Sequence, residues 1–214
     1  MKILNFFYKR SMILYTWPEF FTNEHQVLNA LMDKGVCWLH IYKPNASEEQ
    51  VRQLIDAIEP TFRNRLVIHF YYSLAAEYGL GGIHFARNQY SDRFAGFPWI
   101  SRSAHRWEDI ETAEDSLTHL IISPVFESIS KINHKSHWQL DQLADFFRKG
   151  KNKSFKYVAL GGISPHNYVS VIHAGFDDAA FLGSFWKRFF MSFDMGVVAE
   201  FMAVVGQEEQ KYKN

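Results

Sequence analysis

The sequence has little cysteine, no excess of either charge and no long apolar run. Cys37 is the only cysteine, so neither an internal disulfide nor a cysteine-based metal cluster can form, and a reducing compartment fits best. Lys and Arg number 23, as do Asp and Glu, which argues against nucleic-acid or anionic-membrane partners. No stretch reaches the roughly 18 apolar residues that span a bilayer, and MKILNFFYKR has too short an apolar stretch for a secretory signal. We expect a cytoplasmic protein whose partners are small molecules or protein.

Aromatic residues, in contrast, are abundant. They make up 17% of the chain, with 20 Phe and 6 Trp, which is a larger share than barrel packing alone requires. Part of this aromatic surface is therefore expected to cover an interface between copies of the chain in a homo-oligomer.

Short apolar, β-branched runs alternate with stretches of helical period. Parallel strands buried on both faces and joined by helices of ~10 residues follow from this pattern, which predicts either a closed (β/α)₈ barrel or an open doubly wound sheet. Eight strands can be counted, and we expect the barrel, as a single domain over residues 1–214. The expected strands are 12–16, 36–42, 65–70, 81–85, 98–103, 119–123, 156–160 and 178–183. The expected helices are 24–34, 47–59, 73–78, 107–115, 139–149, 165–174 and 187–205.

The segment VALGGIS, at 158–164, places Gly161 and Gly162 at the end of the seventh strand. Glycines let the backbone approach a ligand, and the N–H groups of a helix capped by Ser164 directly after them favour a phosphate. Barrels share this phosphate position with the end of the eighth strand, here Leu182, Gly183 and Ser184. A turn needed only to connect two elements gives the same pattern, so both interpretations stay open at this point.

The segment SPVFESISK, at 123–131, places Ser128, Ser130 and Lys131 in a polar loop after the sixth strand. Hydroxyls and an ammonium suit phosphate oxygens. Solvated loops often contain these residue types, so the signal depends on the position of the loop, which is on the same barrel face as the glycines.

Histidines gather near the carboxyl ends of the second to fifth strands, where barrel enzymes collect their catalytic groups. They are His40, His69, His84 and His105. A zinc site would need three of them to converge, and no HxH or HxxxH pair supplies this locally, so we favour substrate binding or mutual hydrogen bonding over a metal. Gly81 and Gly82 come before a strand rather than between strand and helix, which argues against a dinucleotide site.

These segments, in this order, resemble the thiamine-phosphate synthase family and its relative, the aminothiazole tautomerase branch. The resemblance covers most of the chain and rests on LHIYKPN, LVIHFYYSLA, GIHFARN, SRSAH, SPVFESISK, VALGGISPHN and FLGS. It implies an enzyme of thiamine biosynthesis that joins a hydroxymethylpyrimidine pyrophosphate to a thiazole phosphate. Pyrophosphate is released through a pyrimidine cation, with Mg²⁺ on the leaving group.

The resemblance also implies roles for particular residues. Ser103 and Lys131 match the family's pyrimidine-pyrophosphate contacts and are expected catalytic positions. His69 is a third expected catalytic residue, from its place near the end of a strand rather than from the resemblance. The thiazole phosphate is expected to bind Ser128, Ser130 and the backbone at Gly161, Gly162, Leu182, Gly183 and Ser184. Further substrate contacts are expected from His40, Tyr42, Lys43, His84 and Arg87.

The pyrimidine half departs from the family pattern. Tyr42 and Pro44 replace an arginine and a lysine that grip pyrophosphate, with Lys43 between them. An Asn-Asp pair becomes His69-Phe70, and the later magnesium carboxylate falls at Asn88 or Gln89. Both magnesium carboxylates are thus replaced, which leaves Arg87, Lys43 or Lys131 to compensate and Asp92 as a substitute ligand. The tautomerase branch has a histidine where this chain has Pro124, although His40 matches a histidine of that branch.

Three hypotheses follow. The first is an enzyme of the thiamine-phosphate synthase type with weak activity. The second is a barrel that binds a thiazole or thiamine phosphate without turnover. The third is a tautomerase-like or other phosphate-substrate isomerase that uses His69, His84 or His105 as a base.

Overall fold

The computed structural model describes residues 12–86, 89–127, 138–150, 155–199, 201 and 203. Eight parallel strands close into a barrel in sequence order, with β8 paired to β1, which confirms the predicted barrel over the open sheet. The strands are β1 (Met12–Tyr15), β2 (Val36–Ile41), β3 (Leu66–Ile68), β4 (Gly82–Phe85), β5 (Trp99–Ala104), β6 (His119–Ile122), β7 (Lys156–Ala159) and β8 (Asp178–Phe181).

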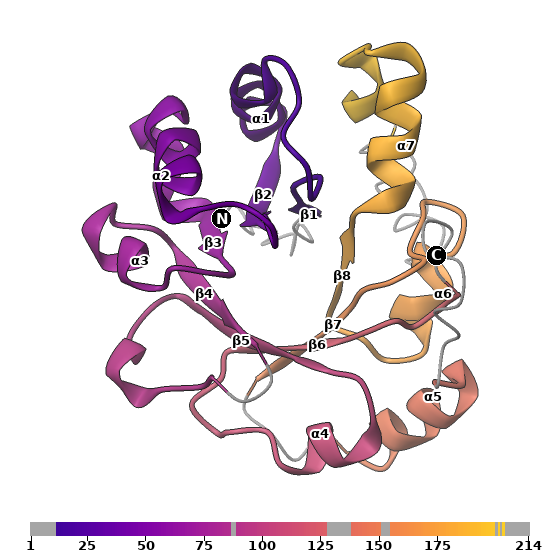
Figure 1. Cartoon of the computed structure of the whole chain (residues 1–214). Helices are drawn as coiled ribbons and strands as arrows, with labels where there is room; N and C mark the ends of the chain where they lie inside the picture. Colours follow the sequence, from indigo (N-terminus) through magenta and orange to yellow (C-terminus); the bar gives the residue numbers. More distant parts are fainter. Residues whose placement is uncertain are drawn as a thin grey trace, which may run out of the picture.

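Helices lie on the outside of the strands and alternate with them along the chain (Figure 1). They are α1 (Glu24–Asp33), α2 (Glu48–Ala57), α3 (Ser73–Glu77), α4 (Trp107–Glu111), α5 (Leu140–Arg148), α6 (Tyr168–His173) and α7 (Gly183–Ser192), with 3₁₀ turns η1 (Pro60–Arg65) and η2 (Asp92–Phe94). No helix in the described ranges is long and apolar enough to cross a bilayer.

The starts of two expected helices, at 47 and directly after Ser164, have different outcomes. Ser47 caps α2 in a capping box: its side chain accepts from the Gln50 N–H, and the Gln50 side chain accepts from the Ser47 N–H. The expected cap at Ser164 is wrong, because residues 164–167 form a turn in which the Ser164 N–H donates to Asn167 Oδ1, and α6 begins only at Tyr168. This turn separates the glycines from α6.

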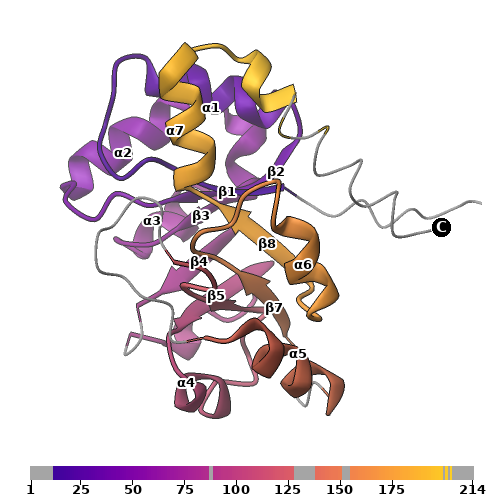
Figure 2. The ribbon, with the colours of Figure 1, turned by 90° about the vertical axis from the view of Figure 1, so that its right-hand side faces the viewer.

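The last helix also differs from expectation. A single helix over 187–205 is wrong, because α7 begins directly after β8, at Gly183, and ends at Ser192. The next residue, Phe193, has a left-handed φ of 49°, which cannot continue a right-handed helix. Figure 2 shows α7 at the same end of the molecule as α1 and α2. The N-terminus of α7 therefore lies at the carboxyl end of β8.

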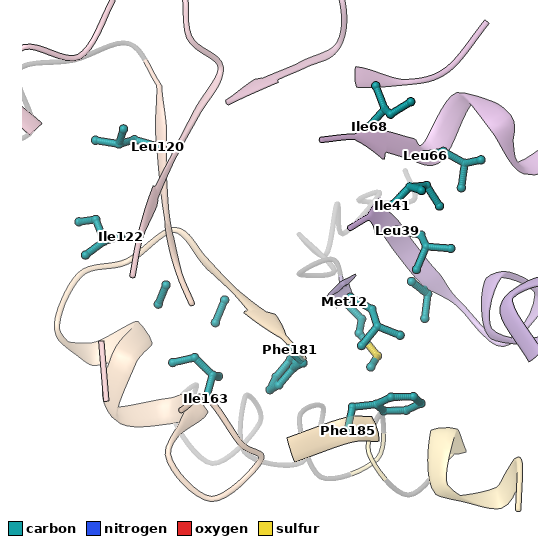
Figure 3. Packing of buried hydrophobic residues seen from close by; sticks show 14 of the residues in the cluster. Met12, Leu39, Ile41, Leu66, Ile68, Leu120, Ile122, Ile163, Phe181 and Phe185 are labelled. Atoms are coloured by element: carbon teal, nitrogen blue, oxygen red, sulfur yellow. The ribbon is translucent and has the colours of Figure 1, made fainter. Parts of the chain in front are cut away.

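Two hydrophobic clusters follow from the alternation of side chains along each strand. The larger cluster fills the space between strands and helices, and Figure 3 shows part of it, including Leu39, Ile41, Leu66, Ile68 and Phe181. The smaller cluster contains strand residues of the opposite parity and fills the barrel: Ile13, Tyr15, Val67, Trp99, Ile121, Val158 and Ala180.

The same alternation turns polar side chains into the barrel. His40 stands between outward-facing Leu39 and Ile41, and His84 stands between Ile83 and Phe85. Both histidines are buried, as is Ser101 on β5. Apolar side chains thus fill part of the barrel interior, and imidazole and hydroxyl groups gather near β2–β5.

Candidate active site at the carboxyl ends of the strands

The turn after β7 has a backbone that requires glycine. Gly161 has a φ of 90° and Gly162 a φ of 66°, both in the left-handed range. A Cβ on Gly161 would lie 2.5 Å from Pro124 Cα, and one on Gly162 would lie 2.7 Å from the Glu127 carbonyl oxygen. The turn is therefore packed tightly against the segment that follows β6, and side chains are excluded from it.

The N-terminus of α7 lies beside this glycine turn. The Trp186 N–H makes the first intrahelical bond, to the Leu182 carbonyl, so the N–H groups of the residues before it have no partner inside the helix. The Ser184 hydroxyl donates to the Ile163 carbonyl at 2.6 Å and joins the two segments. The glycine turn and the N-terminus of a ten-residue helix are thus adjacent, and the free N–H groups of a helix N-terminus suit a phosphate.

Three buried histidines from adjacent strands meet inside the barrel mouth. Nδ1 of His40 lies 3.0 Å from Nε2 of His69, and the rings of His69 and His84 stack with centroids 4.3 Å apart. One ring nitrogen of each lies within 4.8 Å of the others. Because the contact depends on the register of β2, β3 and β4, no local spacing motif in the sequence could have indicated it.

Hydroxyl groups of β5 hold His84. Its Nδ1 lies 2.9 Å from Ser101 Oγ, and its Nε2 lies 3.1 Å from Ser103 Oγ. The Trp99 indole N–H donates to the same Ser101 oxygen at 2.8 Å. The structure therefore brings together four of the expected site residues: His40, His69, His84 and Ser103.

Tyr15 belongs to the same group, and the sequence analysis did not single it out. Its ring stacks on His40 with centroids 4.3 Å apart and meets Tyr42 and His69 edge-on. Its hydroxyl and Nε2 of His40 are buried without a hydrogen-bond partner among the described residues. The available signal was its place at the carboxyl end of β1, the same position that drew attention to the histidines.

Burial keeps these groups uncharged. It lowers the pKa of His40 and His69 well below the ordinary histidine value, and it lowers the pKa of His84 to about 3. Each shift is increased by a neighbouring histidine, since a charge on one ring disfavours a charge on the next. The imidazoles therefore offer lone pairs and neutral N–H groups, and they do not replace the missing arginine and lysine.

Lys43 was expected to contact substrate, but it forms a buried ion pair with Glu24. Its ammonium is buried and contacts both carboxylate oxygens of Glu24, at 2.6 and 2.8 Å. It also donates to the carbonyls of Trp17 and Glu19. Since these protein oxygens use its hydrogens, Lys43 does not compensate for the lost pyrophosphate-binding cations. Tyr42 remains at the site, with its ring 5.4 Å from that of His69.

Other expected residues lie apart or outside the described chain. His105 is exposed, and its Nδ1 donates to the Ser123 carbonyl at 2.6 Å. Asp92 is exposed in η2 and accepts from the Tyr90 hydroxyl, so it does not join the histidines. Arg87, Ser128, Ser130 and Lys131 lie outside the described residues.

The donor set at the ends of β3 and β4 does not fit Mg²⁺ where the chain is described. Mg²⁺ prefers carboxylate and water oxygens. Here the buried groups are the imidazoles of His69 and His84, and the amide oxygen of Gln89 already accepts from the Tyr72 hydroxyl. We therefore derive no step through magnesium.

A closed (β/α)₈ barrel with a glycine turn after β7 joined to the N-terminus of α7, and with polar groups at the carboxyl ends of its strands, has the layout of a barrel enzyme. The chain belongs to the thiamine monophosphate synthase family, whose model matches residues 13–185. A thiamine-phosphate synthase of Koribacter versatilis is 30% identical over 160 residues, which cover 70% of this chain and 74% of that one.

Two solved structures support the fold. The thiamine phosphate pyrophosphorylase of Bacteroides thetaiotaomicron has a TM-score of 0.76 and 24% identity over 94% of this chain and 98% of that chain. The thiamine phosphate pyrophosphorylase of Pyrococcus furiosus has a TM-score of 0.70 and 15% identity over 94% of this chain and 96% of that chain.

Proposed function

We propose that the chain is a transferase of thiamine biosynthesis that joins a hydroxymethylpyrimidine pyrophosphate to a thiazole phosphate and releases pyrophosphate. The observation that carries the proposal is the bond from Ser184 to the Ile163 carbonyl, which joins the glycine turn to the N-terminus of α7. This pair of backbone segments suits the phosphate of the thiazole substrate, with Ser128 and Ser130 as its proposed hydroxyl contacts.

The pyrimidine half of the substrate pair is proposed to bind at the mouth, above the buried histidines. Ser103 is hydrogen-bonded to His84, which fixes the position of its hydroxyl. Tyr15 and Tyr42 flank His69 and supply aromatic faces for a planar ring. We propose that Lys131 and Arg87 neutralise the pyrophosphate, because Lys43 is occupied by Glu24.

Activity is proposed to be weak. In the family the departing pyrophosphate is stabilised by metal-bound carboxylates and by two cations, and the positions that supply them are changed in this chain. Loss of such electrostatic stabilisation costs several kcal/mol in the transition state, which lowers the rate by orders of magnitude.

The replaced carboxylates and the occupied Lys43 also favour a second candidate, a barrel that binds the thiazole or thiamine phosphate without turnover. Both candidates predict loss of thiamine-phosphate affinity in Lys131→Ala by calorimetry, and only the first predicts turnover. An isomerase with His69 or His84 as base is disfavoured, since burial lowers the pKa of both and neither titrates near neutrality.

The direct test is chromatographic detection of thiamine phosphate after incubation of the full chain with both substrates and a divalent cation. We expect product in proportion to enzyme, and none with heat-denatured chain. Absence of product at every enzyme concentration, together with measured thiazole-phosphate binding, would contradict the synthase reaction and support a barrel that binds the phosphate without turnover.

Three further properties are part of the proposal. We propose that residues 1–214 form one domain and that the chain works in the cytoplasm, where a sole cysteine stays reduced. We also propose a homo-oligomer, because Met191 and Phe193 at the end of α7 are 87% and 69% exposed. Light scattering of the purified chain tests the last point, and a monomer at micromolar concentration contradicts it.

A further inference from the structure

We infer that His40, His69 and His84 form a binding site for a divalent transition metal ion of the zinc class. One ring nitrogen from each residue lies within 4.8 Å of the other two, and all three side chains are buried. The inference concerns metal binding itself, and it stands or falls independently of the synthase reaction.

Two of the nitrogens already converge as zinc ligands do. Nδ1 of His40 lies 3.0 Å from Nε2 of His69. Two nitrogens at the usual Zn–N distance of about 2.0–2.1 Å in a tetrahedral site are about 3.4 Å apart. An opening of a few tenths of an ångström therefore turns the histidine pair from a hydrogen bond into two ligands.

Only one of the two ring nitrogens of His40 has a hydrogen-bond partner among the described residues. Its Nε2 is buried and has no partner, and the nearby Tyr15 hydroxyl is in the same condition. When Nδ1 of His40 donates to His69, Nε2 carries a buried lone pair that no described donor meets. Buried polar atoms of this kind are rare. Because Nδ1 is the nitrogen that faces His69, an ion bound by Nδ1 would leave Nε2 as an N–H group, so it is the convergence of the three rings that supports the metal site.

His84 has the support expected of a metal-binding histidine. Such residues usually hold their second ring nitrogen in a hydrogen bond that fixes the ring. Nδ1 of His84 contacts Ser101 Oγ, which is itself held by the Trp99 indole N–H. Nε2 is then the ligand nitrogen. It contacts the Ser103 hydroxyl at 3.1 Å, and the ion would take the place of that hydrogen bond, with a water or substrate oxygen as the fourth ligand of a tetrahedral site.

The donor chemistry selects the class of ion. Three neutral imidazole nitrogens suit Zn²⁺, Co²⁺ or Ni²⁺, whereas Mg²⁺ requires hard oxygen ligands. His69 and His84 each keep 6% exposure, which gives the ion a path from the mouth.

The test uses the full chain, freed of any affinity tag and of metal by a chelator. Calorimetric titration with Zn²⁺ is expected to give one ion per chain, and Co²⁺ is expected to give the visible absorption of a tetrahedral site. Mg²⁺ at the same concentration is expected to give no saturable heat. A wild-type chain that binds neither Zn²⁺ nor Co²⁺ overturns the inference whatever the variants do.

Two variants and a control locate the ion. His69→Gln removes a ligand, and we expect it to weaken Zn²⁺ binding by about 100-fold or more, while Ser101→Ala removes only the support of His84 and is expected to weaken it by about 10- to 100-fold. His173→Gln, on the exposed end of α6, is expected to leave the affinity unchanged. If His69→Gln does not fold, the Zn²⁺ affinities of Ser101→Ala and His173→Gln still locate the ion. A Zn²⁺ affinity that falls in His173→Gln and not in Ser101→Ala overturns the inference.

The two proposals fail in distinguishable ways. Zn²⁺ binding without thiamine-phosphate formation would contradict the proposed synthase reaction and support the metal site. Thiamine-phosphate formation by a chain that binds no Zn²⁺ removes the metal site and keeps the reaction.

Discussion

Nδ1 of His40 lies 3.0 Å from Nε2 of His69 inside the barrel mouth. The resemblance to the synthase family implies an amide and a carboxylate where this chain has His69 and Phe70, so a neutral imidazole and a phenyl ring stand where oxygen ligands for magnesium are expected. The turn after β7, at the opposite side of the barrel, has the two glycines expected of a phosphate site. The proposed phosphate site and the histidine cluster can each be tested separately.

Gly162→Ala tests the phosphate turn. A Cβ there would lie 2.7 Å from the Glu127 carbonyl oxygen, on a backbone with φ of 66°. We expect a loss of thiazole-phosphate affinity by calorimetry and a loss of stability larger than the roughly 1–2 kcal/mol of left-handed strain alone. Gly79→Ala is the matched control, because Gly79 has a φ of 63° with nothing within 4 Å. It should lose stability without losing affinity; equal effects on affinity would contradict the assignment.

Ser184→Ala tests the link between the turn and α7. Without the hydroxyl, the Ile163 carbonyl loses its donor, and the two backbone segments lose about 0.5–1.5 kcal/mol of mutual support. We expect thiazole-phosphate binding to weaken by about tenfold at most in this variant. Ser170→Ala, whose exposed hydroxyl donates to the Asn167 carbonyl at 2.7 Å, should bind as the wild type does. Unchanged affinity in Ser184→Ala would show that the link does not shape the site.

Lys43→Met tests whether Lys43 supports the fold or binds substrate. The change leaves the Glu24 carboxylate buried without its partner, and such losses cost about 3–5 kcal/mol of folding free energy. In the Glu24→Gln/Lys43→Met double variant we expect part of that stability back, as measured by urea unfolding. The double variant should also bind the pyrimidine pyrophosphate with wild-type affinity. A loss of that affinity in a stably folded double variant would show that Lys43 contacts the substrate.

His119→Phe tests the effect of a half-buried histidine on the pH dependence of stability. The His119 ring stacks on Trp99 at 3.6 Å, and burial lowers its pKa to about 3. Its unfolded pKa is about 6.5, so the unfolded state binds the extra proton between the two values and stability falls as pH drops through this window.

Phenylalanine keeps the stacking and removes the titration. Between pH 7.5 and 5.5 we expect the wild type to lose about 1 kcal/mol more unfolding free energy than His119→Phe. Urea unfolding of both proteins at the two pH values measures this difference. The same pH dependence in both would mean that His119 is protonated equally in the folded and unfolded states.

The fold could be predicted from the sequence because its signals are local and repeated. Each strand is a short apolar run followed by a helical pattern, and the Ser47 capping box is set by residues three apart. The last helix was misplaced because the aromatic residues of 183–192 look like core in any element, and the stop at Phe193 is a backbone conformation that composition does not show.

The site could be predicted only in part. Gly161 and Gly162 carry a backbone signal that the sequence shows, so the tight turn after β7 could be predicted, while its phosphate stays a prediction. The histidine cluster depends on strand register, which places His69, directly after β3, beside His84 of β4, and no spacing rule gives it. Lys43 was assigned to substrate because its partner Glu24 lies 19 residues away, on α1.

³¹P NMR of the full chain with both substrates at stoichiometric enzyme shows whether this barrel forms thiamine phosphate. We expect the pyrimidine pyrophosphate signals to decline while free pyrophosphate and thiamine phosphate appear together in equal amounts. Pyrimidine pyrophosphate that stays intact beside bound thiazole phosphate, with Mg²⁺ or Zn²⁺ present, would contradict it.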